Sequence, residues 1–188
     1  ARCASHWQQA GNPVREQAIA LELRGNGHAL LNEHAAASSA LAQALALYRT
    51  RAAESIRVAI ALNALANSQQ ASGDLASAKT GYNEALRMSQ KINYREGIAY
   101  ITANLADFAL RQNDWPTAQT LAEQALQLAS ALGRQQLIAS NHHCLAKAML
   151  AQQQAASALP HAQQAVAIFT RLASPELAQA ILPHLADE

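Results

Sequence analysis

The stretch SGDLASAKTGYNEAL, residues 72–86, decides the fold of this chain. Gly73 can take the left-handed backbone conformation that ends one helix, and Asp74 can cap the free amides that begin the next. The residues after this turn have the spacing of one helix face: Ala78, Tyr82 and Ala85. The stretch therefore predicts the turn and the second helix of a helical hairpin.

Copies of this pattern recur at a spacing of 40 residues. The Leu65-Ala66 pair returns at residues 105–106 and 145–146, and Ala78 returns at residues 118 and 158. The turn position holds Gly73, then Asn113, then Gln153. At a spacing of 41, an earlier unit carries related residues: Gly25, Asn32, Ala37, Leu41 and Ala44. The sequence therefore predicts four units of one repeated hairpin.

A hairpin of this kind leaves half of its apolar stripe uncovered, so neighbouring hairpins must stack. We therefore expect an all-α fold, a right-handed superhelical solenoid of stacked antiparallel helix hairpins. Four hairpins are expected over residues 13–173. Residues 1–12 are predicted to form the second helix of a truncated preceding repeat, and residues 174–188 a C-terminal capping helix or the start of a fifth repeat.

Proline placement sets two of the predicted helix starts. In NDWPTA, Asp114 can cap a helix whose first turn contains Pro116, where no amide hydrogen is missed. Pro160 is tolerated in the first turn of a helix but not further in. We therefore expect the last helix of the fourth unit to begin late, with Ser157 as its cap.

The repeated residues Leu62, Leu65, Ala66 and Gln69, followed by Ala78 and Tyr82, resemble the signature of the tetratricopeptide repeat (TPR) family, W-x2-L-G-x2-Y followed by A-x3-F. The resemblance covers residues 13–173 and is to the long type with about 40 residues per repeat, which is seen in bacterial regulatory and signalling proteins. It implies a TPR-like array with a concave groove that binds a protein or peptide partner.

Composition narrows the classes of partner. Fourteen basic and thirteen acidic residues leave a net charge of +1, so no field of one sign favours direct nucleic-acid binding. No apolar run approaches the roughly 20 residues that span a bilayer. Two cysteines are too few for a disulfide framework. We expect a cytoplasmic protein that binds neither nucleic acid nor membrane.

Polar residues recur at helical spacing on the first helix of each predicted hairpin, and they predict the groove. They are Asn63, Asn67, Gln70, Tyr100, Asn104, Asp107, Arg111, His143 and Lys147. An asparagine amide can both donate to and accept from a peptide backbone, and Arg111 and Lys147 can select an acidic group. Leu110 and Leu150 are expected to give apolar contact. The same residues are also what the solvated face of any amphipathic helix would show.

Motifs for catalysis and metal binding are absent from the sequence. It has no phosphate-binding glycine loop, no nucleophile elbow and no H-E-x-x-H. His142, His143 and Cys144 are adjacent, so on a helix they diverge by about 100° each and cannot converge on one ion without ligands from another unit. The cationic positions of the TPR carboxylate clamp hold Asn63, Ser140 and Cys144 instead. No catalytic residue, metal or cofactor is predicted.

The resulting hypothesis is a non-catalytic protein- or peptide-binding TPR module, a fragment of a larger bacterial regulatory or signalling protein. Other domains of the full-length protein would be intramolecular partners, and exposed end repeats would permit a homodimer. The alternative hypothesis is a small-molecule-sensing regulatory arm of a signalling ATPase or transcription activator.

Overall fold

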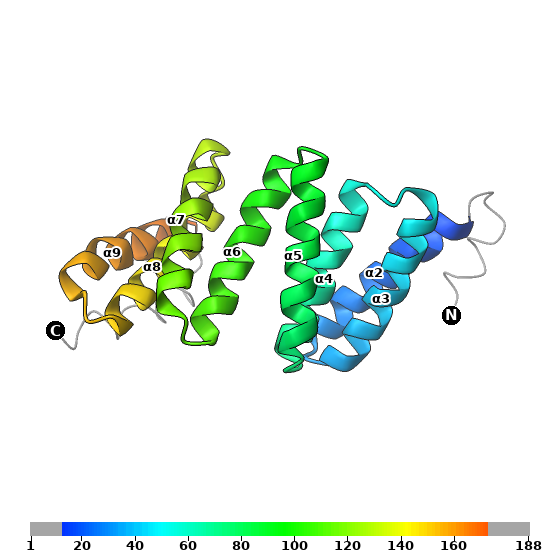
Figure 1. Ribbon diagram of the computed structural model, residues 1–188, viewed down its shortest axis with the longest axis horizontal. Helices are drawn as coiled ribbons and strands as arrows, with labels where there is room; N and C mark the ends of the chain where they lie inside the picture. The colour runs from blue at the N-terminus through cyan, green and yellow to red at the C-terminus, as the bar shows by residue number, and fades with distance from the viewer. Residues whose placement is uncertain (1–12, 173–188) are drawn as a thin grey trace. The chain divides into compact units, whose positions relative to one another are not determined.

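A computed structural model describes residues 13–172 of the chain, and within them every regular element is an α-helix (Figure 1). The helices are α2 (Pro13–Leu30), α3 (His34–Arg51), α4 (Ile56–Ala71), α5 (Leu75–Lys91), α6 (Arg95–Arg111), α7 (Trp115–Ala131), α8 (Gln135–Ala151) and α9 (Ala155–Arg171). The predicted fold class, an all-α array of antiparallel hairpins, is confirmed. The predicted elements at residues 1–12 and 174–188 lie outside the described residues.

The chain divides into two compact units, residues 1–97 and 98–188. In the first unit α2 packs on α3, α3 on α4, and α4 on α5. In the second unit α7 packs on α8 and α8 on α9, and α6 joins them through a shared apolar cluster. No helix between residues 13 and 172 is long and apolar enough to cross a membrane.

Six of the seven connections between α2 and α9 are one kind of turn. Each turn has a single left-handed residue: Asn32, Gly73, Asn93, Asn113, Gly133 and Gln153. At the second of them the Gly73 amide donates to the Gln70 carbonyl at 3.1 Å and the Asp74 amide donates to the Gln69 carbonyl at 2.9 Å. Both bonds satisfy carbonyls at the end of α4 that have no partner within the helix. From Gly73 onward the turns recur every 20 residues, so the backbone repeats at half the predicted spacing.

The connection between α3 and α4 is the exception. Ala52 is extended, with φ −155°, and Ser55 caps α4 by accepting a hydrogen bond from the Val58 amide. This longer connection lies in the segment where the sequence spacing is 41 instead of 40. The irregular spacing therefore marks a different linker, and the hairpins on either side keep their form.

Two predicted helix caps are confirmed. The Asp74 carboxylate accepts from the Ser77 amide at 3.1 Å, and the Asp114 carboxylate accepts from the Thr117 amide at 3.3 Å. The cap lowers the pKa of Asp74, through hydrogen bonds to the Ser77 side chain and backbone. Pro116 lies in the first turn of α7, as expected.

The core is built on small residues at the helix crossings. Two sets of alanines that recur every 40 residues are buried: Ala78, Ala118 and Ala158, and Ala85, Ala125 and Ala165. At the crossing of α2 and α3, a Cβ added to Gly25 would lie 2.6 Å from Leu41 Cγ, so only glycine fits there. Alanine and glycine let the helix axes approach closely, which is why an alanine-rich chain with few aromatic residues can fill its interior.

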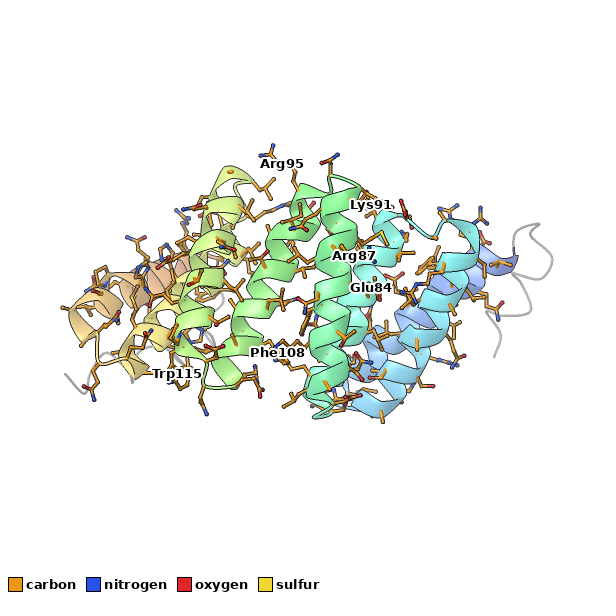
Figure 2. The ribbon with its side chains drawn as sticks, viewed as in Figure 1. Glu84, Arg87, Lys91, Arg95, Phe108 and Trp115 are labelled. Atoms are coloured by element: carbon orange, nitrogen blue, oxygen red, sulfur yellow. The ribbon has the colours of Figure 1, made fainter. Side chains whose placement is uncertain are left out.

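Ion pairs on the surface of the first unit link α5 to the residues before it. Arg49 Nη2 lies 2.6 Å from Glu84 Oε1, and Lys91 pairs with Glu54. Figure 2 shows Glu84 and Lys91 two turns apart along α5. Because all four side chains are substantially exposed, each pair contributes only a few tenths of a kcal/mol.

The predicted late start of the last helix is wrong. α9 begins at Ala155 with Gln154 as its N-cap, so Ser157 lies inside the first turn and Pro160 lies within the helix. The left-handed residue Gln153 places the helix start, and this start brings Ala158 to the same crossing position as Ala118. Packing at that crossing therefore outweighs the backbone hydrogen bond that Pro160 cannot donate.

We predict that Pro160→Ala stabilises the protein, because it restores an amide donor at an exposed position inside a helix. The free energy of unfolding should rise by about 1 to 3 kcal/mol, measured by urea denaturation followed by circular dichroism. Pro116→Ala is the matched control and should change stability little, since a first-turn proline sacrifices no bond. Equal effects of the two substitutions would contradict the explanation.

Candidate partner-binding pocket

The second unit contains a pocket of about 520 Å³ between α6 and α8. Six of the predicted groove residues line it: Tyr100, Asn104, Asp107 and Arg111 from α6, and His143 and Lys147 from α8. These residues share one face of each helix because they follow one another at three- or four-residue steps. The volume is within the range of about 300 to 1,000 Å³ that is typical of ligand pockets.

Apolar residues that are almost fully buried form the floor of this pocket. Leu110, Leu137 and Cys144 are 8%, 6% and 7% exposed. Leu110 was predicted to give apolar contact, and it does line the pocket. Leu150 does not, because it packs instead against the apolar cluster that α6, α7, α8 and α9 share.

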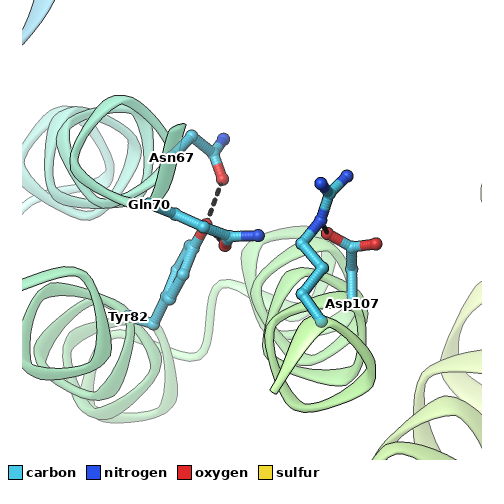
Figure 3. Close-up of polar contacts among 5 residues, drawn as sticks. Asn67, Gln70, Tyr82 and Asp107 are labelled. Atoms are coloured by element: carbon cyan, nitrogen blue, oxygen red, sulfur yellow. Dashed lines mark hydrogen bonds and ion pairs between the residues drawn. The ribbon is translucent and has the colours of Figure 1, made fainter. Parts of the chain in front are cut away.

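The charges around the pocket are not evenly paired. Arg111 Nε donates to Asp107 Oδ2 at 2.7 Å, which forms an i, i+4 ion pair on α6 (Figure 3). Lys147 forms no ion pair or hydrogen bond with any residue between 13 and 172. Since the arginine and the aspartate neutralise each other, Lys147 leaves the pocket with an excess of one positive charge.

The thiol of Cys144 is not an activated nucleophile. Burial raises its pKa to about 12, and the nearby Asp107 carboxylate adds to the effect. The thiol is therefore protonated at neutral pH, whereas nucleophilic cysteines need a lowered pKa. Cys144 serves as a small apolar side chain in the floor of the pocket and in the core cluster.

The predicted residues of the first unit have a different local role. The Tyr82 hydroxyl lies 2.6 Å from Asn67 Oδ1 and 2.7 Å from Gln70 Oε1 (Figure 3). The hydroxyl has one proton, and the two amide oxygens share it as acceptors. These two amides therefore tie α4 to the buried Tyr82 of α5. Asn63 is half-buried and is absent from the lining of two pockets of this unit, one beside Leu62 and one beside Asn67.

A contact between two histidines joins α8 to α9, and the sequence did not predict it. His142 Nδ1 and His161 Nδ1 are 2.8 Å apart, so one imidazole donates and the other accepts. Two repeat lengths earlier, the same positions hold Leu62 and Gly81. The two positions therefore change together to histidine between repeats. This joint change could have predicted the contact, but only if the two positions were already known to lie side by side.

The surroundings of His142 and His161 favour the neutral form of both imidazoles. Desolvation lowers the pKa of His142, and charge on His161 lowers it further. Desolvation also lowers the pKa of His161, although Glu123 on α7 partly opposes this.

Among residues 13–172, no group of three or more His, Cys, Asp or Glu side chains is placed to hold a metal ion. His142, His143 and Cys144 therefore do not form such a group.

Comparison with known proteins places this architecture among the α-helical repeat arrays. BtubC (BKLC) from P. vanneervenii superposes with a TM-score of 0.74 at 19% sequence identity, over 85% of this chain and 65% of the BtubC chain. This chain thus spans less than two thirds of the length of BtubC. A putative kinesin light chain with nearly identical TPR-like repeats from Podosopora anserina gives a TM-score of 0.70 at 19% identity, over 90% of this chain and 87% of the other. Its Q17M variant gives 0.72 at 19%, over 94% and 89%.

The class defined by these helices is therefore the TPR-like solenoid. The tetratricopeptide repeat family model matches residues 57–131 and 96–171, which together cover more than half of the sequence. The chain belongs to the tetratricopeptide repeat family. Curated protein sequences gave no significant match.

We predict that Tyr82→Phe destabilises the first unit by about 0.5 to 1.5 kcal/mol, because the Asn67 and Gln70 amides lose their shared hydroxyl partner. Urea denaturation followed by circular dichroism measures the change. Tyr100→Phe removes a hydroxyl from an exposed tyrosine and is the matched control. If both variants were as stable as the parent, the amides of α4 would not depend on Tyr82.

The histidine pair predicts a loss of stability in mild acid. Because both pKa values are lowered by folding, the unfolded state binds more protons as the pH falls below about 6.5. The melting temperature should therefore decrease from about pH 7.5 to about pH 5. It should decrease less in His142→Gln/His161→Gln than in the parent protein or in His143→Gln. An identical pH dependence in all three proteins would exclude the pair as the cause.

Proposed function

We propose that this chain is a non-catalytic protein-binding module and that the pocket between α6 and α8 holds a segment of a partner protein. The observation that carries the proposal is the convergence of six polar side chains from two neighbouring first helices over an apolar floor. TPR proteins in general bind other proteins, and this chain belongs to that family.

The pocket has the kinds of groups that an extended segment needs. Asn104, Gln136 and Ser140 offer side-chain donors and acceptors to backbone amides and carbonyls. Leu110 and Leu137 offer an apolar surface to a side chain of the segment. This combination of polar groups around an apolar floor is typical of specific recognition sites.

The wider setting is proposed on the resemblance to long-repeat TPR proteins. The module would consist of four repeats over residues 13–173 and would belong to a larger cytoplasmic regulatory or signalling protein of bacteria. Asn63 remains a proposed contact residue, whereas Asn67 and Gln70 would reach a partner only in addition to their contact with Tyr82.

A small-molecule-sensing arm is the second candidate, because the pocket volume also fits a metabolite-sized ligand. In this case the ligand would bridge α6 and α8 and change how the array packs against the rest of the larger protein. A heat-stable, low-molecular-mass fraction of a cell extract would then contain the ligand.

Capture of partners from an extract of the source cells tests the proposal. The parent protein should retain a partner that Asn104→Ala/Lys147→Ala retains about fivefold less, as expected from losing polar contacts in the pocket. The matched control is Asn83→Ala/Lys79→Ala, which removes the same residue types from exposed positions on α5.

Circular dichroism should first show that both double variants are folded. Equal capture by the parent and the pocket variant would contradict the proposed binding site. If the low-molecular-mass filtrate of the same extract raised the melting temperature of the parent and not of the pocket variant, the sensing function would replace it.

A further inference from the structure

The pocket between α6 and α8 carries a cation that has no counterion in the described part of the chain. Lys147 lies on α8 one helical turn after His143, and both line the pocket. No residue between 13 and 172 forms an ion pair with Lys147. An ammonium group left beside a partly apolar pocket is where a partner can supply the missing negative charge.

The second cation of the pocket is already engaged. The Arg111 guanidinium binds the Asp107 carboxylate on its own helix. The contact is made through Nε, and the Asp107 carboxylate beside it lowers the attraction of this guanidinium for a further anion. Asp107 would also repel a doubly charged phosphate more than a singly charged carboxylate. The charge pattern thus favours a single carboxylate.

The apolar floor lies next to this cation. Leu110 and Leu137 are buried beneath the opening, and Cys144, one turn of α8 before Lys147, is a protonated and uncharged neighbour. An occupant that satisfied Lys147 would therefore place its adjoining side chain against aliphatic surface. A free acidic metabolite without an apolar group would leave that surface wet.

We propose that the partner segment carries an aspartate or glutamate that pairs with Lys147, beside an aliphatic side chain that packs on Leu110 and Leu137. This inference rests on the proposed function, because it specifies which segment the pocket selects. Lys147 is thus the residue that determines specificity for the acidic side chain. The arrangement differs from a carboxylate clamp, because a single lysine and not several cations pairs with the carboxylate.

Selection from a random peptide library displayed on phage tests the preference directly. Clones bound by the parent protein should be enriched in Asp or Glu next to Leu, Ile or Val. Clones selected on Lys147→Glu should carry Lys or Arg at the acidic position. Lys79→Glu reverses an exposed lysine on α5 and should select the same clones as the parent.

A synthetic copy of the enriched peptide gives the quantitative measurement. By fluorescence anisotropy, Lys147→Ala should weaken its binding about two- to fivefold, as should replacement of its acidic residue by the neutral amide. Binding to the parent should weaken with added salt, because the ion pair is open to solvent. Circular dichroism verifies that each variant is folded.

The outcomes separate this inference from the function on which it rests. Peptides that bind the parent better than Asn104→Ala but show no acidic preference would overturn the role of Lys147 and leave the binding module standing. If no peptide distinguished the parent from Asn104→Ala, the peptide-binding pocket itself would be overturned. Acidic selection that persisted in Lys147→Glu would assign the preference to another cation and refute the proposal.

Discussion

The close crossing of helices at alanine positions is the constraint on which this structure depends. Ala78, Ala118 and Ala158 are buried at corresponding places, and the missing side chain of Gly25 allows a close contact with Leu41. At such distances a larger side chain has nowhere to go, because interiors are packed to crystal-like density. The position of each helix is therefore set by the crossing, and local preferences give way to it. Pro160 illustrates the rule, since it is kept inside α9 despite its missing amide.

The same constraint separates the two helices of each pair by role. In the second unit, α7 and α9 contribute alanines to the packed core, whereas α6 and α8 contribute both core residues and the polar residues of the pocket. Leu110 and Cys144 belong to both sets, so the floor of the pocket is also part of the core. A substitution in this floor should consequently affect stability as well as the proposed binding, while a change at the exposed Lys147 should affect the proposed binding alone.

The sequence was sufficient to predict the fold because the fold is repeated. Corresponding residues forty apart, such as Ala78 and Ala118, gave independent copies of one pattern, and two turn residues, Gly73 and Asp74, had a direct conformational meaning. Asn93 and Gly133 form the same turn, yet they were not predicted because the comparison at a spacing of 40 sampled only every second turn. The start of α9 was misplaced because a local proline rule was applied where tertiary packing decides.

The site was predictable only in part, since spacing on one helix says nothing about contacts between helices. Helical spacing correctly grouped Asp107 with Arg111, but it could not show that Asn67 reaches Tyr82 or that His142 reaches His161. These contacts join residues that are 15 and 19 positions apart. Their detection requires knowing which faces of two helices meet.

The turns described above give the array two periods with different meanings. From Gly73 onward the chain reverses direction through a left-handed turn every 20 residues, but the pattern of residue types recurs only every 40. Gaining or losing a single helix with its turn would keep the 20-residue spacing of the turns but would put the 40-residue sequence pattern out of step from that point onward. Growth of such an array by duplication is therefore expected to add helices in pairs. The hairpin of two helices is the smallest unit that can be duplicated without disturbing the pattern.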